Sequence, residues 1–255
     1  MLTCERRKYI LDLLKEKKSI SSSELAEKLK ISESTIRRDL AILSKENKLH
    51  KVHGGAVVIE DYYNAEEKNV EIKHSINTDK KISIAKYAAN LIDKDDFVYI
   101  DAGTTTEILI DYIMQKGAHY VTNGIVHAKK LAEKGLDVII IGGKLKISTE
   151  AIVGVEAVNN IKKYNFTKGF FGTNAISEMS GYSTPDIEEA LVKKEAIVRS
   201  KKCYILADSD KFNKTSCVSF AKVSDGIIIT DKNVKDYKIN TKIIEVKEND
   251  LYSDF

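Results

Sequence analysis

The chain has 255 residues, enough for one large domain or for a small domain followed by a larger one. Its composition, 43% hydrophobic and 31% charged, is typical of a globular protein, and no apolar run approaches the roughly 20 residues of a membrane helix. The first residues lack the apolar core of a signal peptide, so we expect a cytoplasmic protein. Three scattered cysteines favour neither a disulfide framework nor a zinc site.

The net charge of +3 is unevenly distributed along the chain. Residues 1–59 hold 13 lysines and arginines against 8 carboxylates, whereas residues 60–255 hold 28 against 30. A basic first part before a slightly acidic remainder favours a nucleic-acid partner for the first part.

Three short helices are expected in the first part. Helical apolar spacing predicts one around residues 10–14, and the basic residues 6–8 leave the other side of this helix basic. A second, at Ser22–Leu29, opens with the capping-box spacing of Ser21 and Glu24. The third covers Ile31–Leu43 with Ser32 as its N-cap. Two short helices separated by a few residues form a helix-turn-helix.

The third helix has two different faces. Ile36, Leu40 and Leu43 form an apolar stripe, and the opposite face carries hydroxyl and guanidinium groups. Such groups can bind guanine edges and phosphates, as a recognition helix does, although an ordinary solvated helix face is the alternative. The candidate DNA-contacting residues are Ser34, Thr35, Arg37 and Arg38.

Residues 49–59 predict a hairpin after this helix. Two strand-like runs flank Gly54 and Gly55, and Lys51 and His53 lie beside them. A hairpin in this position is a wing, which can place amides and cations along a phosphate strand. We therefore add Lys51, His53, Gly54 and Gly55 to the candidates, although a lone histidine such as His53 is more often a surface turn residue.

From Lys80 onward, helical and apolar strand-like stretches alternate. This alternation predicts a mainly parallel, doubly wound α/β sheet covered on both faces. The polar, mixed-charge stretch at residues 60–78 suits a connector. We therefore expect a winged helix-turn-helix domain at 1–59, a connector at 60–78 and a larger domain at 79–255. The expected helices are 82–91, 105–114, 126–133 and 188–200, and the expected strands are 97–100, 120–122, 138–141, 169–171, 204–207, 227–230 and 243–246.

Ligands of parallel sheets bind beyond the carboxyl ends of the strands. The turn Asp101–Thr106, DAGTTT, follows the strand FVYI and opens a helix, so its amides and hydroxyls form a small anion cradle. Thr104 could instead be a simple helix cap, and Lys211 could pair with a phosphate or with Asp208. Candidate ligand residues at these strand ends are Asp101, Gly103, Thr104, Thr105, Thr106, Thr122, Asn123, Asp208 and Lys211.

The first part resembles the winged helix of the DeoR family. The runs TIRRDL at Thr35–Leu40 and HGGA at His53–Ala56 both match the family pattern. The resemblance implies that Thr35, Arg37 and Arg38 face DNA and that the wing assists. Asn47 stands where the family usually has glycine, but asparagine also tolerates the left-handed conformation.

The larger part is similar to the sensor domain of the same family. KISIAKYAANLI, DAGTTT, TNG, IGGKL, GTNAIS, GYSTPDIEEALVKK and LADSDKF match it in order. The resemblance implies a fold like type A ribose 5-phosphate isomerase and a phosphorylated-sugar effector. It places the phosphate on residues 103–106, with Asp208 and Lys211 near the sugar, and adds Lys80, Glu188 and Lys194 as polar contributors. STPDIEEALVKK most resembles the branch that governs fructose or lactose phosphotransferase operons.

A catalytically active sugar-phosphate isomerase is the competing interpretation. Isomerisation needs a carboxylate base, but the aligned run GTNAI has no acid and Lys194 stands where a glutamate is expected. A shift of one residue in this alignment would bring in Glu195. A third interpretation is that the larger domain only mediates oligomerisation.

We expect a transcriptional repressor of a sugar-utilisation operon that is not an enzyme and uses no cofactor or metal. Its expected partners are double-stranded operator DNA, a phosphorylated-sugar effector and further copies of itself. A homodimer or homotetramer is expected because one winged helix-turn-helix domain, called the head below, makes only a small DNA interface.

Overall fold

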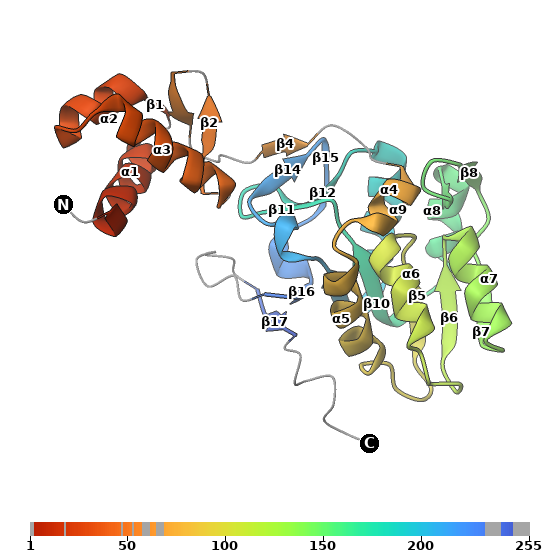
Figure 1. Cartoon of the computed structure of the whole chain (residues 1–255). Helices are drawn as coiled ribbons and strands as arrows, with labels where there is room; N and C mark the ends of the chain where they lie inside the picture. The colour runs from red at the N-terminus through yellow and green to blue at the C-terminus, as the bar shows by residue number, and fades with distance from the viewer. Residues whose placement is uncertain are drawn as a thin grey trace. The chain divides into compact units, whose positions relative to one another are not determined.

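The computed structural model in Figure 1 describes residues 3–17, 19–46, 48–52, 54–57, 62–64, 69–232 and 241–246. The chain separates into two compact units, residues 1–62 and residues 63–255. Asn47, His53 and, within the expected connector, residues 60–61 and 65–68 lie outside the described residues. Within the described ranges, no helix has the length and hydropathy needed to cross a membrane.

The first unit contains the expected helix-turn-helix and hairpin. A short strand that the sequence did not predict adds to the hairpin, giving an antiparallel sheet with the order β1-β3-β2. The apolar stripe of the third helix packs into one core with Ile10, Leu25 and Leu49. The elements are α1 (Thr3–Lys17), β1 (Ser19–Ser21), α2 (Ser22–Leu29), α3 (Glu33–Lys45), β2 (His50–Val52) and β3 (Gly55–Val57).

Both predicted helix caps are present. The Ser21 hydroxyl accepts a hydrogen bond from the Glu24 amide at 3.0 Å, and the Ser32 hydroxyl accepts one from the Thr35 amide at 3.4 Å. The Glu24 carboxylate pairs with Lys17 at 2.5 Å rather than returning to the cap. These caps satisfy amides that have no intrahelical acceptor and so fix where α2 and α3 begin.

The second unit is built on a seven-stranded parallel sheet with the order β17-β16-β13-β10-β5-β6-β7. This confirms the doubly wound α/β architecture. The strands are β5 (Phe97–Ile100), β6 (His119–Thr122), β7 (Asp137–Ile140), β10 (Phe166–Gly172), β13 (Ser200–Leu206), β16 (Ile227–Thr230) and β17 (Ile243–Glu245). The principal helices are α5 (Thr78–Ala89), α6 (Thr104–Asp111), α7 (Ile125–Glu133), α8 (Val155–Ile161) and α9 (Ile187–Val198).

Helices cover both faces of the sheet (Figure 1). Val98 and Ile100 join one core with residues of α5, α6 and α7, whereas Tyr99 joins the other with residues of α8 and α9. The expectation of full burial was wrong for the outermost strand, β7. Ile139 and Ile140 are exposed there because an edge strand is covered less completely by its neighbours.

Several short elements were not predicted because they are too brief to show a hydrophobic period. An antiparallel sheet, ordered β11-β12-β15, packs beside α9, and β8 pairs with β9 as a hairpin. These elements are β4 (Tyr62–Asn64), α4 (Val70–Ser75), β8 (Lys144–Lys146), β9 (Ala151–Val153), β11 (Ala175–Ser177), β12 (Gly181–Thr184), β14 (Lys214–Ser216) and β15 (Val218–Ala221), with 3-10 turns at Ser209–Lys211 and Val223–Asp225.

The strand order locates the position where a ligand can enter. The chain runs outward from β5 to β7, returns to β10 beside β5, and then continues outward in the other direction. The two connections leave a crevice beyond the carboxyl ends of β5 and β10.

Candidate functional sites

Hydrogen bonds within the chain hold the turn between β5 and α6 in place. The Thr106 hydroxyl donates to the carbonyls of Asp101 at 2.5 Å and Gly103 at 2.8 Å. The Asn123 side-chain oxygen accepts from the Ala102 amide at 2.8 Å, and His127 accepts from the Gly103 amide at 3.3 Å. Thr106 and Asn123, which the sequence suggested as ligand contacts, therefore brace the turn from behind.

His127 is an uncharged partner in this arrangement. Burial lowers the pKa of His127 to about 3, so the imidazole is neutral near pH 7. Thr122 also has a local role: its buried hydroxyl accepts from the Gly124 amide at 3.0 Å and does not line the cavity described below.

Thr104 and Thr105 present the open part of the turn. Gly103 is the N-cap of α6, which makes these threonines its first two helical residues. The first amides of a helix have no intrahelical acceptor. In the described part of the chain, neither these amides nor the two hydroxyls have another hydrogen-bond partner. Two amides and two hydroxyls are therefore available as donors at the N-terminus of α6.

These donors line a cavity of about 220 Å³ at the carboxyl ends of β5 and β10. The described residues around it carry five lysines and three carboxylates, together with four threonines and two asparagines. The lysines are Lys73, Lys81, Lys193, Lys211 and Lys214, and the carboxylates are Glu189, Asp208 and Asp210. Their balance favours an anionic ligand.

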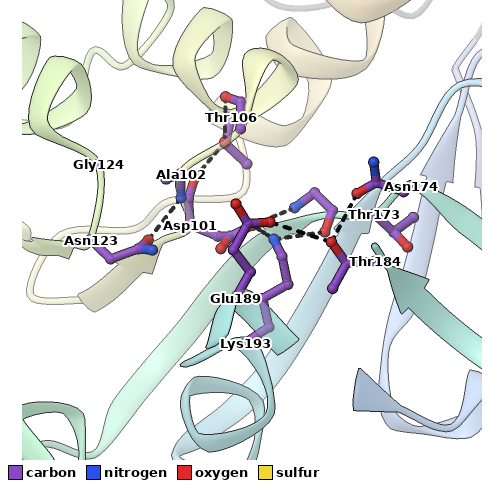
Figure 2. Close-up of polar contacts among 12 residues, drawn as sticks. Asp101, Ala102, Thr106, Asn123, Gly124, Thr173, Asn174, Thr184, Glu189 and Lys193 are labelled. Carbon is purple, nitrogen blue, oxygen red and sulfur yellow. Dashed lines mark hydrogen bonds and ion pairs between the residues drawn. The ribbon is translucent and has the colours of Figure 1, made fainter. Parts of the chain in front are cut away.

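A buried ion pair lies between the carboxyl ends of β5 and β10, where the strand order reverses. The Lys193 ammonium, from α9, contacts the Asp101 carboxylate at the end of β5 and lies 3.3 Å from the Gly172 carbonyl at the end of β10 (Figure 2). The Gly172 amide donates to the same carboxylate at 3.0 Å. Burial raises the pKa of Asp101, and Lys193 opposes this shift. Asp101, which the sequence suggested as a ligand residue, is buried and does not line the cavity, and its pair with Lys193 joins β5, β10 and α9 at the base.

Glu189 lies one helical turn before Lys193, on the same face of α9 (Figure 2). Its carboxylate accepts hydrogen bonds from Thr149 at 2.6 Å, Lys146 at 3.1 Å and Thr184 at 3.3 Å. Although burial opposes the charged form, the nearby Lys193 and these donors lower the pKa of Glu189. The carboxylate is therefore ionised beside the cavity.

The structure corrects the assignment of Glu188 and Lys194 to this cavity. Glu188 pairs with Lys144 at 2.9 Å on the outer surface, and Lys194 is exposed beside a separate groove. Neither lines the cavity, whereas their neighbours Glu189 and Lys193 do. One residue turns the direction of a helical side chain by about 100°, so neighbouring positions of α9 lie on its inner and outer faces.

Lys80 and Lys81 show the same contrast: the predicted residue lies outside the cavity, and its neighbour lines it. The Lys80 ammonium pairs with Asp210 at 3.0 Å and does not line the cavity. Lys81 is buried, lines the cavity and donates to the Lys73 carbonyl in α4. Burial, reinforced by Lys211, lowers the pKa of Lys81 to about 8. Nothing in the sequence favoured Lys81 over Lys80, because only the phase of α5 separates the two lysines.

Asp208 and Lys211 both reach the cavity, as expected. The Asp208 carboxylate accepts from the Asp210 amide at 3.0 Å. The alternative ion pair between Asp208 and Lys211 is not formed, and the described residues offer the Lys211 ammonium no other ion-pair partner. Its charge is directed at the cavity without a protein counter-ion.

The outer face of α3 carries Ser34, Arg37 and Arg38, all exposed. Arg37 pairs with Glu33 at 2.7 Å, one helical turn away, and the Thr35 hydroxyl lies 3.0 Å from that of Ser32. Arg38 has no ion-pair partner in the described part of the unit. This face leaves guanidinium groups accessible to a phosphate backbone or a base edge.

The basic side expected for the first helix is partly neutralised. Arg6 and Arg7 bind the buried Asp39 carboxylate at 2.6 and 3.0 Å. In the hairpin, Lys51 and Gly54 are exposed, but Gly55 is buried between strands. Gly55 therefore serves packing, and it is not accessible to DNA as predicted. His53 cannot be placed, because it lies outside the described residues.

The described residues contain no cluster of three or more histidine, cysteine or acidic side chains arranged to hold a metal ion.

Known proteins resemble both units. The sequence profile of the DeoR-like helix-turn-helix domain matches residues 6–62, and that of the DeoR C-terminal sensor domain matches residues 76–232. FruR of Bacillus subtilis, described as an uncharacterized HTH-type transcriptional regulator, is 40% identical over 231 residues, covering 90% of this chain and 91% of that protein. The lactose phosphotransferase system repressor of Staphylococcus aureus is 32% identical over 246 residues, covering 95% and 96%.

Among solved structures, ribose 5-phosphate isomerase A of Methanocaldococcus jannaschii aligns over 53% of this chain and 55% of that chain, with 12% identity and a TM-score of 0.41.

A winged helix-turn-helix joined to a sensor domain defines a DNA-binding transcriptional regulator. The matches to both domains, and to full-length relatives at 32–40% identity, show that this chain belongs to the DeoR family.

Proposed function

We propose that this regulator represses a sugar-utilisation operon and that a phosphorylated sugar, bound without chemical change in the cavity, controls its affinity for operator DNA. The observation that carries the proposal is the excess of lysines over carboxylates around the cavity, beside the open N-terminus of α6. The name of the similar lactose phosphotransferase system repressor favours a sugar-related operon. Like other transcriptional regulators, the protein would act in the cytoplasm.

The donors divide between the two parts of such a ligand. Thr104 and Thr105 offer amides and hydroxyls, and Lys211 offers an ammonium group without a counter-ion in the described region, which suits a phosphoryl group. Thr173 and Asn174 line the cavity on the β10 side and offer polar groups to the sugar hydroxyls, with Glu189 beside them. A ligand between them would contact β5, β10 and α9 together.

Control of DNA binding requires only a difference in ligand affinity between two states of the protein. Each 1.4 kcal/mol of difference changes operator affinity about tenfold, so about 3 kcal/mol is sufficient for a change of more than a hundredfold. The head would bind double-stranded DNA through α3 and the wing, in repeated half-sites occupied by a dimer or tetramer.

The carboxylates of the cavity favour binding over isomerisation. A general base needs an accessible lone pair. Glu189 is ionised with three donors on its carboxylate, and Asp101 is held by Lys193. Glu195 pairs with Arg199 at 2.9 Å and does not line the cavity. The competing enzyme would interconvert aldose and ketose phosphates, and that activity would be lost in Glu189→Gln.

Two substitutions test the proposal. Thr105→Val should abolish the thermal shift given by fructose 1-phosphate, tagatose 6-phosphate or tagatose 1,6-bisphosphate, and leave a gel shift on DNA upstream of the gene unchanged. Arg38→Ala should do the reverse. If no phosphorylated sugar stabilises the protein, or if both substitutions impair both activities equally, the proposed division of roles is wrong.

A further inference from the structure

Helix α9 has a second exposed face that the cavity does not use. Its exposed positions are 187, 191, 194 and 198, which are spaced by four, three and four residues. Three of them are apolar: Ile187, Leu191 and Val198 have exposed fractions of 56%, 48% and 71%. This spacing is typical of a seam between two helices.

The surroundings of α9 differ at its two ends. Near its N-terminus, the Lys144–Glu188 ion pair lies beside exposed Leu145, and exposed Val155 begins the adjacent helix α8. Near its C-terminus is a groove of about 630 Å³. The groove's apolar lining is Met179, Ile197, Val198, Phe220, Ala221 and Val223. Exposed apolar side chains thus lie near one end of α9, and a groove of mixed apolar and polar lining lies near the other.

We propose that two copies of this chain associate about a two-fold axis through this face, with their α9 helices antiparallel. Positions 187 and 198 share a midpoint with positions 191 and 194, so antiparallel pairing sets Ile187 against Val198 of the second copy and Leu191 against Lys194. The exposed apolar side chains near the N-terminus of one α9 then face the groove of the other copy. A two-fold interface requires this kind of self-complementary surface.

The charges on α9 favour a second copy in this orientation. Opposite Leu191, Lys194 lies between Glu188 and Glu195 of the other helix, which flank that leucine by about one turn on either side. Each glutamate also keeps an ion pair within its own chain, Glu188 with Lys144 and Glu195 with Arg199. Parallel pairing would instead set the two Lys194 ammonium groups against each other. The antiparallel seam therefore brings opposite charges near each other, whereas the parallel one brings like charges together, and this favours the antiparallel orientation.

The seam would connect ligand binding to assembly, and this consequence rests on the proposed function. Glu189 and Lys193 line the cavity from the opposite face of the same helix. A ligand that contacts them can shift α9 and so alter the distance between two heads. Two linked heads bind two half-sites far more tightly than one, because a single small DNA-binding module buries only about 600–1,000 Å².

Sedimentation velocity on the full-length chain tests the interface. We expect a dimer at micromolar concentration and a dissociation constant at least about tenfold higher for Leu191→Glu, because a charge would enter the centre of the seam. Met114→Glu is the matched control, since Met114 is 84% exposed and lies outside this face. A monomeric wild-type chain, or a dimer that Leu191→Glu does not weaken, would overturn the proposal.

Disulfide cross-linking tests the orientation in a Cys4→Ser, Cys217→Ser background. Ile187→Cys combined with Val198→Cys should form covalent dimers, whereas Ile187→Cys alone should not, because residues 187 of the two copies would lie about 16 Å apart along the seam. Cross-linking by Ile187→Cys alone, or none by the pair, contradicts antiparallel packing. Leu191→Glu should retain the thermal shift with sugar phosphates, which separates a failed interface from a failed effector site.

Discussion

Neighbouring residues in this chain often have opposite roles. In the TIRRDL run, Arg37 and Arg38 face outward, whereas Asp39 is buried and binds two arginines of α1. In α9, Glu189 and Lys193 face the cavity, and Glu188 and Lys194 face outward. The direction in which a side chain leaves its helix decides whether it packs inside or faces solvent. Substitutions of two adjacent residues can therefore be compared as a test and its control.

Asp39 should stabilise the first unit in a pH-dependent way. Although burial opposes its charged form, hydrogen bonds from Arg6 and Arg7 hold the pKa of Asp39 below its ordinary value. This stabilisation is present above the ordinary carboxyl pKa of about 4 and is lost as pH falls through the folded value. Asp39→Ala should cost about 2–3 kcal/mol at pH 7, measured by urea unfolding.

Glu33→Ala is the control for Asp39→Ala, because Glu33 forms an exposed pair with Arg37. It should leave the urea midpoint almost unchanged. Equal losses from the two substitutions would show that the buried pairs contribute no more than a surface pair.

Lys81 should make effector binding weaken at alkaline pH. Its pKa is lowered to about 8, mainly by burial, so the lysine loses its charge as pH rises through this value. Without ligand, stability should increase from pH 8 towards the ordinary lysine pKa, since the unfolded chain binds the additional proton there. Calorimetric titration with a sugar phosphate at pH 7 and pH 9 should show weaker binding at pH 9, where the phosphate charge no longer changes.

Lys81→Met is the variant that isolates this effect. Methionine fits the buried stem of the side chain and cannot titrate, so the difference between pH 7 and pH 9 should largely disappear. An unchanged pH dependence in Lys81→Met would assign it to another group.

At the scale of elements, the three-stranded sheet of the head depends on the close approach of β1 and β3. A Cβ atom at Gly55 would lie 2.3 Å from the Ile20 carbonyl oxygen, which is closer than two such atoms can pack. Gly54, in the adjoining turn, has a φ of +85° but nothing within 4 Å of its Cβ position. Packing constrains the first glycine, and backbone conformation constrains the second.

Gly55→Ala should therefore displace β3 from β1 and weaken both folding of the head and binding to DNA. Gly54→Asn should be tolerated at a cost of about 1 kcal/mol or less, because asparagine accepts a positive φ. Thermal unfolding and gel shift of the two variants measure this contrast. Similar behaviour of both would contradict the role of packing at Gly55.

At the scale of the whole molecule, the two units have separate apolar cores. Leu40 is fully buried in the core of the first unit, and the second unit has one core on each face of its sheet. Each core can be disrupted on its own, so the units should unfold in separate steps.

Leu40→Ala should cost the first unit about 2–5 kcal/mol by leaving a cavity. Calorimetry should show the head transition at a lower temperature and the transition of the larger unit unchanged, and a sugar phosphate should move only the latter. A single transition that shifts as a whole would indicate that the two units unfold together.

The sequence alone determined the order and type of the main elements, because periodicity and capping are local. Ser21 and Ser32 cap the predicted helices, and the strands FVYI and IIIT lie where they were predicted. Strand polarity then placed DAGTTT at the edge where ligands of parallel sheets bind, and the cavity lies there.

Only the tertiary structure decided which side chains reach the cavity. Lys81 rather than Lys80, and Lys193 rather than Lys194, lie against it, and Asn123 supports the turn instead of facing a ligand. A helix turns each successive side chain by about 100°, so an uncertainty of one residue exchanges cavity and solvent. Sequence spacing predicts the elements that meet, whereas packing fixes the rotation with which they meet.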